Sequence, residues 1–170
     1  MGPDNATLSV LTGRTGAAAK AGHDLVILVT SWEATLVLGE DPAQATIELS
    51  ADATSLRVQE GSGGMKALGE DDKTNIQKSI DDDVLKRKDI TFRSTEVHGA
   101  AGEDRLSVQG ELTLMGKAQP VTFDLDIADD GTIAGTAVVT QTAWGMKPYS
   151  TMLGALKVAD DVRVAVNGAL

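Results

Sequence analysis

Two histidines are the side chains of this sequence best suited to proton transfer or metal binding. His23 stands just before a long apolar run, and His98 precedes a loop rich in glycine and alanine. An imidazole near neutrality can act as a base, contact a polar head group or ligate a metal. Neither histidine has a clear carboxylate partner, so the sequence predicts no metal site. We expect His98 in a solvated loop and His23 at the mouth of the fold, where a hydrogen bond to the backbone that orders a turn is favoured over contact with a head group, a base or a metal ligand.

Residues 141–157 form the most unusual segment. It holds one of the two tryptophans, the only tyrosine and two of the five methionines. Because it falls between two strand-like runs, we expect a loop at one end of the fold. One interpretation is a plug that seals the core with Trp144, Met152 and Leu156. The other is a lid over an apolar cavity, with polar contacts at its rim from Lys147 and Tyr149.

Other candidate motifs for chemistry are incomplete. The glycine-rich stretch 61–64 lacks the Gly-Lys-Ser/Thr ending of a phosphate-binding loop and is interpreted as a flexible connection. The acidic runs 70–72 and 81–83 lack the spacing of a calcium loop. No serine lies in a Gly-x-Ser-x-Gly elbow, and the absence of cysteine excludes disulfides and thiolate chemistry. The sequence therefore predicts no catalytic residue and no cofactor.

Strand-like alternation dominates the elements that would position these residues. The even positions from Val26 to Leu38 predict one long strand, or two with a bend, with an apolar even face. Residues 106–114 and 121–127 predict a hairpin, in which inward Gly110 marks a kink or a close approach. The Asp-Asp-Gly turn at 129–131 leads into a further strand at 132–140. Similar runs lie at 47–51, 90–94 and 162–167.

Helical signal is scarce. Residues 72–85 place Ile76, Ile80 and Val84 four apart and predict a helix. The alanine-rich residues 15–21 predict a second, shorter helix that ends before Gly22. About eight alternating runs with one or two short helices favour an all-β fold, an antiparallel eight-stranded barrel with helices across its ends.

Composition limits the class of protein. The 170 residues predict one domain over 1–170, and with 3% aromatic residues its core must consist of small aliphatic side chains. A net charge of −10 repels phosphate backbones and anionic membrane faces, so we expect no nucleic-acid partner. Residues 1–7 show no secretory signal, and no apolar run approaches the roughly 18 residues of a membrane span. We expect a cytoplasmic protein, with a periplasmic or secreted location as the alternative.

Two blocks resemble the YceI-like family. Ile-Thr-Phe-Arg-Ser-Thr at 90–95 and Val-Gln-Gly-Glu-Leu-Thr-Leu-Met-Gly-Lys-Ala-Gln-Pro-Val-Thr-Phe at 108–123 are similar to the family's "itF.St … v.G.Lti.G.tkpv.l" pattern. The likeness extends over most of residues 7–168. The family's histidine-containing opening and its "RD.HL" stretch are absent; residues 13–25 and 72–76 stand in their places. The chain thus resembles a divergent, actinobacterial-type branch, and no head-group contact is transferred from the family.

This resemblance implies a lipocalin-like barrel that binds a polyisoprenoid or another long amphiphile as a carrier, in a role that includes stress response. We therefore expect a non-enzymatic protein whose ligand is a long-chain isoprenoid lipid or an isoprenoid quinone. An enzyme acting on an apolar isoprenoid-like substrate through His23, Arg14 or Tyr149 is one alternative. An interaction module with a filled barrel is the other. The oligomeric state is left open, with a homodimer among its possibilities.

The candidate site follows from the inward strand faces and the unusual loop. The expected polar rim consists of Arg14, His23, Lys147 and Tyr149. The expected apolar lining consists of Val26, Leu28, Trp32, Leu36, Ile47, Leu49, Phe92, Val108, Leu112, Phe123, Trp144, Met152 and Leu156.

Overall fold

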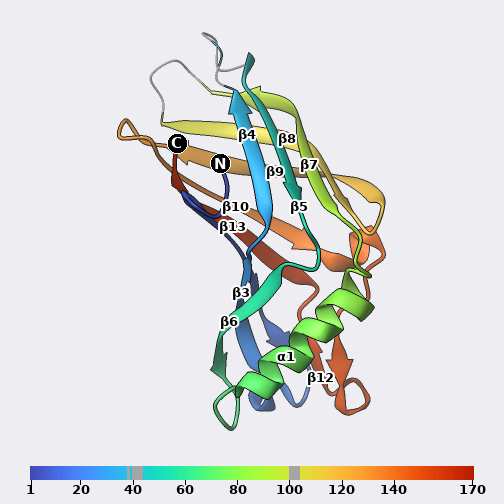
Figure 1. Cartoon of the computed structure of the whole chain (residues 1–170). Coiled ribbons are helices and arrows are strands. Elements are labelled where there is room, and N and C mark those ends of the chain that lie inside the picture. Colours follow the sequence, from blue (N-terminus) through green and yellow to red (C-terminus); the bar gives the residue numbers. More distant parts are fainter. Residues whose placement is uncertain (38, 40–43, 100–103) are drawn as a thin grey trace.

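The computed structural model describes residues 1–37, 39, 44–99 and 104–170. Leu38, at the end of the predicted long strand, and residues 100–102 of the expected loop lie outside this part of the chain. One ten-stranded antiparallel sheet forms most of the molecule (Figure 1). Its strands are β1 (Ala6–Thr12), β3 (His23–Val29), β4 (Trp32–Val37), β5 (Thr46–Ala51), β6 (Leu56–Gly63), β7 (Ile90–His98), β8 (Arg105–Leu114), β9 (Lys117–Ile127), β10 (Thr132–Thr140) and β13 (Asp161–Ala169).

The sheet curls into a barrel because two of its strands are long and bent. Its order is β4-β5-β7-β8-β9-β10-β13-β1-β3-β6. β3 continues into β4 through Thr30 and Ser31, and β5 continues into β6 through a short turn. Hydrogen bonds join the two bends, from Thr30 N to Ser55 O (3.0 Å) and from Asp52 N to Ser31 O (3.0 Å). The lipocalin-like all-β fold is confirmed. The sheet has ten strands where eight are predicted, and β1 and β6 are not among the predicted runs.

The central hairpin is confirmed. β8 pairs with β9 from Arg105↔Asp126 to Leu114↔Lys117. The turn is tighter than predicted, because Met115 and Gly116 alone connect the strands, with φ of 57° and 75°. On β8, Gly110 packs against Phe92 of β7: a Cβ at this position would lie 2.5 Å from the Phe92 ring. The close approach predicted for this glycine is therefore present.

Helix α1 (Glu70–Ser79) continues as a π-helical turn, Ile80–Val84, so the helix predicted over 72–85 is confirmed. It lies across the lower part of the barrel and packs on β6 (Figure 1). The helix predicted over 15–21 is wrong. Only a 3-10 turn forms, at Ala19–Ala21, and β2 (Arg14–Thr15) pairs with β12 (Leu156–Val158).

Two further features complete the lower end. β12 also pairs with β11 (Ser150–Thr151), which makes a small three-stranded sheet with β2. Short 3-10 turns precede these strands at Gln141–Trp144 and Met152–Gly154. Among the described residues, no helix is both long enough and apolar enough to cross a membrane.

The predicted inward face of the first long strand is wrong in its first half. In β3 the buried side chains are Leu25, Ile27 and Val29, whereas Val26 and Leu28 face outward. In β4 the even positions face inward, as at Trp32. The inward positions Val29 and Trp32 are three residues apart, so the bend between them shifts the two-residue period by one position.

Candidate ligand-binding cavity

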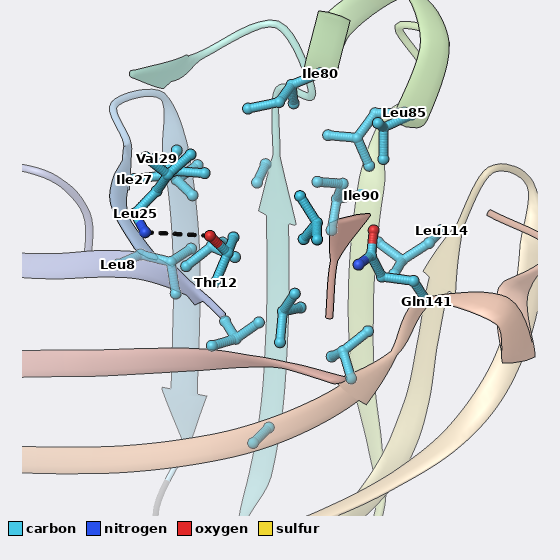
Figure 2. Close-up of a pocket in the computed structure, with 18 of the residues that line it drawn as sticks. Leu8, Thr12, Leu25, Ile27, Val29, Ile80, Leu85, Ile90, Leu114 and Gln141 are labelled. Atoms are coloured by element: carbon cyan, nitrogen blue, oxygen red, sulfur yellow. Dashed lines mark hydrogen bonds between the residues drawn. The ribbon is translucent and has the colours of Figure 1, made fainter. Parts of the chain in front are cut away.

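A cavity of about 620 Å³ lies inside the barrel, within the size range of small-molecule sites. Figure 2 shows aliphatic side chains from separate strands directed into a shared space, among them Leu8 of β1, Ile27 of β3 and Leu114 of β8. Ile80 and Leu85, after helix α1, border the same space from above in this view. The wall is therefore a continuous aliphatic surface to which strands and the helical segment both contribute.

Eight of the residues expected in the apolar lining belong to the cavity wall. Seven of them come from the ten-stranded sheet, and Phe92 and Phe123 contact each other with ring centroids 5.6 Å apart. These eight residues are Trp32, Leu36, Ile47, Leu49, Phe92, Leu112, Phe123 and Leu156. Their part in ligand binding remains a prediction.

Five expected lining residues lie outside the wall. Val26 and Leu28 face outward for the reason given above. Val108 is fully buried, but in the part of the core that is packed solid. Trp144 is also buried, and its Nε1 donates a hydrogen bond to the Leu112 carbonyl oxygen (2.8 Å). Met152 is 58% exposed at the tip of a hairpin, so it does not seal the core.

Arg14 and His23 belong to the cavity wall. They lie at the end of the cavity near β2, β6 and β12, which is at the bottom of Figure 1 and is called the lower end below. The Arg14 Nη1 donates hydrogen bonds to the carbonyl oxygens of Gly22 (2.6 Å) and Ser62 (3.0 Å). The Asp24 carboxylate accepts a hydrogen bond from the Arg14 backbone N–H (3.0 Å). His23 Nε2 donates to the Lys66 carbonyl oxygen (2.9 Å), because a carbonyl can only accept. The structural hydrogen bond considered for His23 is thus present.

The glycine-rich stretch 61–64 has a structural purpose at this end that the sequence did not reveal. Gly63 ends β6 with φ of +81°, and Gly64 follows with φ of +74°. A Cβ on Gly63 would overlap the Arg14 guanidinium, and one on Gly64 would overlap the His23 ring. Glycine is therefore required here both for the backbone conformation and for the close approach of these two side chains.

Of the other two residues expected in the rim, Tyr149 belongs to the cavity wall and Lys147 does not. Tyr149 is in the wall and 46% exposed, whereas Lys147 is exposed and outside the wall. Both interpretations of segment 141–157, as a plug of the core and as a lid over a cavity, apply in part. Trp144 packs in the core as a plug would, while Tyr149 and Leu156 form the edge of the cavity. Lys66 and Lys157 also reach the wall here and were not predicted.

The chain's matches to known proteins agree with this architecture. The family model for the YceI-like domain matches residues 9–170. The chain belongs to the YceI-like family. Among the curated proteins, none matches the sequence closely enough to count as a relative.

Solved YceI-like structures share the fold at low sequence identity. The crystal structure of Burkholderia cenocepacia BcnA superposes with a TM-score of 0.70 at 19% identity, covering 95% of this chain and 94% of that one. A Campylobacter jejuni YCEI protein superposes with a TM-score of 0.58 at 13% identity, covering 85% and 82% of the two chains. At such identities the likeness shows the barrel, and the cavity has to be interpreted from this chain's own side chains.

Two polar side chains in the wall of this YceI-like protein form hydrogen bonds that hold the fold together. Thr12 accepts a hydrogen bond from the Leu25 backbone N–H (3.2 Å; Figure 2). Gln141 donates to the Ala159 carbonyl oxygen (2.9 Å). Within the described part of the chain, no group of three or more His, Asp or Glu side chains could hold a metal. The arrangement suits an apolar guest with polar contacts at one end.

Sequence reasoning missed much of the wall. Leu8 and Val10 of β1 alternate with Thr7 and Ser9, a strand signal that was present but was not used. Leu125 lies in the predicted hairpin but is not among the residues expected in the lining. Helical Ile76, Ile80 and Val84 were recognised as one apolar stripe, although nothing in the sequence showed that the stripe faces the cavity. The additional wall residues also include Leu25, Ile27, Val29, Leu114, Ile133, Val139, Val162, Val164 and Val166.

Proposed function

We propose that this protein binds a long-chain isoprenoid lipid or an isoprenoid quinone inside the barrel and acts as its carrier or store. The observation that supports this proposal most directly is the 620 Å³ cavity with its aliphatic wall. Each methylene group buried there contributes about 0.8 kcal/mol, so a partly enclosed isoprenoid tail binds tightly without many polar contacts. A carrier role in stress response follows from the family resemblance.

The ligand's orientation follows from the position of the polar groups. Arg14, His23 and Tyr149 share the lower end of the cavity with Lys66 and Lys157. The remaining surface is mostly Leu, Ile and Val. In the proposed complex the branched tail therefore lies along the aliphatic wall, and the head group stays at the lower end.

Binding without catalysis is favoured over an enzyme by the contacts of the candidate polar residues. The Arg14 guanidinium donates to two backbone carbonyls, and the His23 Nε2 donates to a third. These atoms of Arg14 and His23 thus hold backbone segments together, and a base would have to be the other ring nitrogen of His23, Nδ1.

The proposal is tested by lipid analysis of gently purified protein and by titration with a solubilised isoprenoid quinone. Ala137 lines the cavity from β10, so Ala137→Phe fills space that the tail would occupy. We expect this variant to lose about tenfold or more in affinity. The matched control is Ala165→Phe on β13, at a position outside the wall; its affinity should equal that of the parent.

Two results would contradict the proposal. One is a purified protein that carries no lipid and ignores added isoprenoids. The other is turnover of a bound isoprenoid that His23→Ala abolishes, which would assign the cavity to an enzyme.

A further inference from the structure

Charge is unevenly distributed over this acidic chain. Three segments, residues 13–22, 61–69 and 142–159, contain no aspartate or glutamate, although the chain has 25 such residues. We call these three segments together the basic cap. Its charged side chains are all positive: Arg14, Lys20, Lys66, Lys147 and Lys157. Against a net charge of −10 for the whole chain, these three segments carry the opposite sign, although acidic residues of β3, β6 and α1 flank them.

The three segments meet in space. β2, from the first segment, pairs with β12, from the third. Arg14 donates to the Ser62 carbonyl oxygen, and His23, directly after the first segment, contacts the Lys66 carbonyl oxygen in the second. Figure 1 shows these loops and β12 at the lower end of the barrel, away from both chain ends. The three segments therefore adjoin one another in the fold.

Acidic side chains border the basic cap, and two of them form ion pairs. The Asp24 carboxylate lies 3.8 Å from the Arg14 Nε, and Glu70 at the start of α1 forms an ion pair with Lys73 (2.9 Å). Lys20 and Lys147 are exposed, and neither forms an ion pair within the described part of the chain.

The basic cap also presents large apolar side chains to solvent. Leu153 is 109% exposed, Met65 is 86% exposed and Met152 is 58% exposed. Met152 and Leu153 form the tip of the hairpin between β11 and β12, where their φ angles are 52° and 55°. Left-handed backbone is unfavourable for such residues and is found mainly where function requires it. This tip does not pack in the core, so its apolar side chains have no role in holding the fold together.

The hairpin that carries this tip is also part of the cavity. Tyr149, Thr151, Leu156 and Lys157 are in the wall, and Leu153 lies between them in sequence. A surface that covers the tip would consequently lie against the lower end of the cavity.

We propose that the basic cap docks on an anionic phospholipid surface, with Met65, Met152 and Leu153 inserted among the lipids and the lysines against the lipid phosphates. This inference rests on the proposed function, because docking would place the polar end of the cavity at the source of its lipid. Apolar anchors beside lysines are the pattern of interfacial membrane binding. The net negative charge does not oppose this, because physiological salt screens charges beyond about 8 Å and the membrane would meet the basic cap first.

Vesicle co-sedimentation tests the docking. The full chain should bind vesicles of phosphatidylcholine with phosphatidylglycerol, and it should bind weakly to phosphatidylcholine alone. Leu153→Glu should weaken this binding about tenfold or more. The double change Lys20→Gln and Lys147→Gln should weaken it about twenty-fivefold, since each lysine near a membrane contributes about fivefold. The controls Val37→Glu, at an exposed apolar position on β4, and Lys88→Gln, outside the basic cap, should bind as the parent does.

The same preparations are titrated with a solubilised isoprenoid quinone, so that the two proposals can fail separately. Quinone binding without vesicle binding overturns the docking and leaves the carrier function standing. Vesicle binding without quinone binding overturns the carrier function and leaves the docking standing. The docking is also overturned if Leu153→Glu binds vesicles like the parent. A dimer that Leu153→Glu dissociates, with no vesicle binding, would instead assign the tip to a second copy of the chain.

Discussion

The guanidinium of Arg14 occupies the space next to the Cα of Gly63 where any other residue would place its Cβ. Arg14 comes from β2 and Gly63 ends β6, so this contact joins two elements that are distant in sequence. The contact brings the Arg14 Nη1 within hydrogen-bonding distance of the Ser62 carbonyl oxygen (3.0 Å). The lower end of the cavity is thus closed on one side by an arginine that only a glycine can accommodate.

Gly63→Ala should lower the free energy of unfolding by about 2–4 kcal/mol, through the positive φ and the overlap with Arg14 together. Gly145→Ala is the matched control, because Gly145 has φ of +77° and nothing lies within 4 Å of its missing Cβ. This control should lose only about 1 kcal/mol. In an Arg14→Ala background, Gly63→Ala should lower the free energy of unfolding only as much as Gly145→Ala does. Urea unfolding measures this free energy for all these variants. An undiminished loss there would show that the overlap does not matter.

The two tryptophans should respond differently to replacement by phenylalanine. Trp144→Phe removes the hydrogen bond to the Leu112 carbonyl oxygen and should cost about 1 kcal/mol beyond the change in buried area. Within the described part of the chain, the Trp32 Nε1 is buried without a hydrogen-bond partner, so Trp32→Phe removes an unsatisfied polar group. This change should lower the free energy of unfolding less than Trp144→Phe does, or should even raise it. Unfolding followed by far-UV circular dichroism avoids the altered fluorescence. Equal losses would contradict the assigned contacts.

Burial raises the pKa of the Asp81 carboxyl above its ordinary value, against the opposing attraction of Arg87 and Arg57. Among residues 1–37, 39, 44–99 and 104–170, none offers the Asp81 Oδ1 a hydrogen bond. Because the folded chain holds this proton more strongly than the unfolded chain does, Asp81 reduces stability as pH rises through its folded pKa. Asp81→Asn should therefore stabilise the protein near neutrality. The difference should shrink in acid, where Asp81 is protonated; urea unfolding across this pH range measures it.

Asp52 should show the opposite dependence. The Thr54 backbone N–H (2.7 Å) and hydroxyl (2.8 Å) donate to the Asp52 carboxylate and lower its pKa. The stability from these bonds is present above the unfolded pKa and is lost as pH falls through the folded pKa. Asp52→Ala should thus cost about 1–2 kcal/mol near neutrality and less in acid, by the same unfolding measurement. A constant difference across the pH range would rule out the ionised carboxylate as the acceptor.

Alternation predicted the fold well wherever polar and apolar side chains take turns. Residues 106–127 alternate clearly, and they form the predicted hairpin, with a turn at Met115 and Gly116 that is shorter than the predicted one. In residues 25–29 all five side chains are apolar, so alternation gave no basis for choosing Leu25 and Ile27 over Val26 and Leu28. After the bend at Thr30 and Ser31, the inward side chains are at even positions, whereas before it they are at odd positions. A bend of this kind depends on hydrogen bonds to the turn after β5, which are not visible in a local pattern.

The candidate site was only partly predictable, because a side chain can be buried without facing the cavity. Val108 and Trp144 were correctly expected inside, but they pack against protein and not against the hollow. Which inward residues meet each other depends on the curvature of the whole barrel. Met152 was expected in the core from its type alone, and its exposure follows from a left-handed turn that no motif announces.

The ladder of the sheet has two ends, β4 and β6, and these lie in opposite halves of the barrel (Figure 1). Strands at the end of a ladder are bonded on one side only, so they exchange their amide hydrogens through local fraying long before the central strands do. We expect β9 and β10 to retain deuterium-resistant amides longest and β6 to lose them early. Since β6 ends at the polar mouth, transient opening there widens the entrance while the centre of the barrel stays intact.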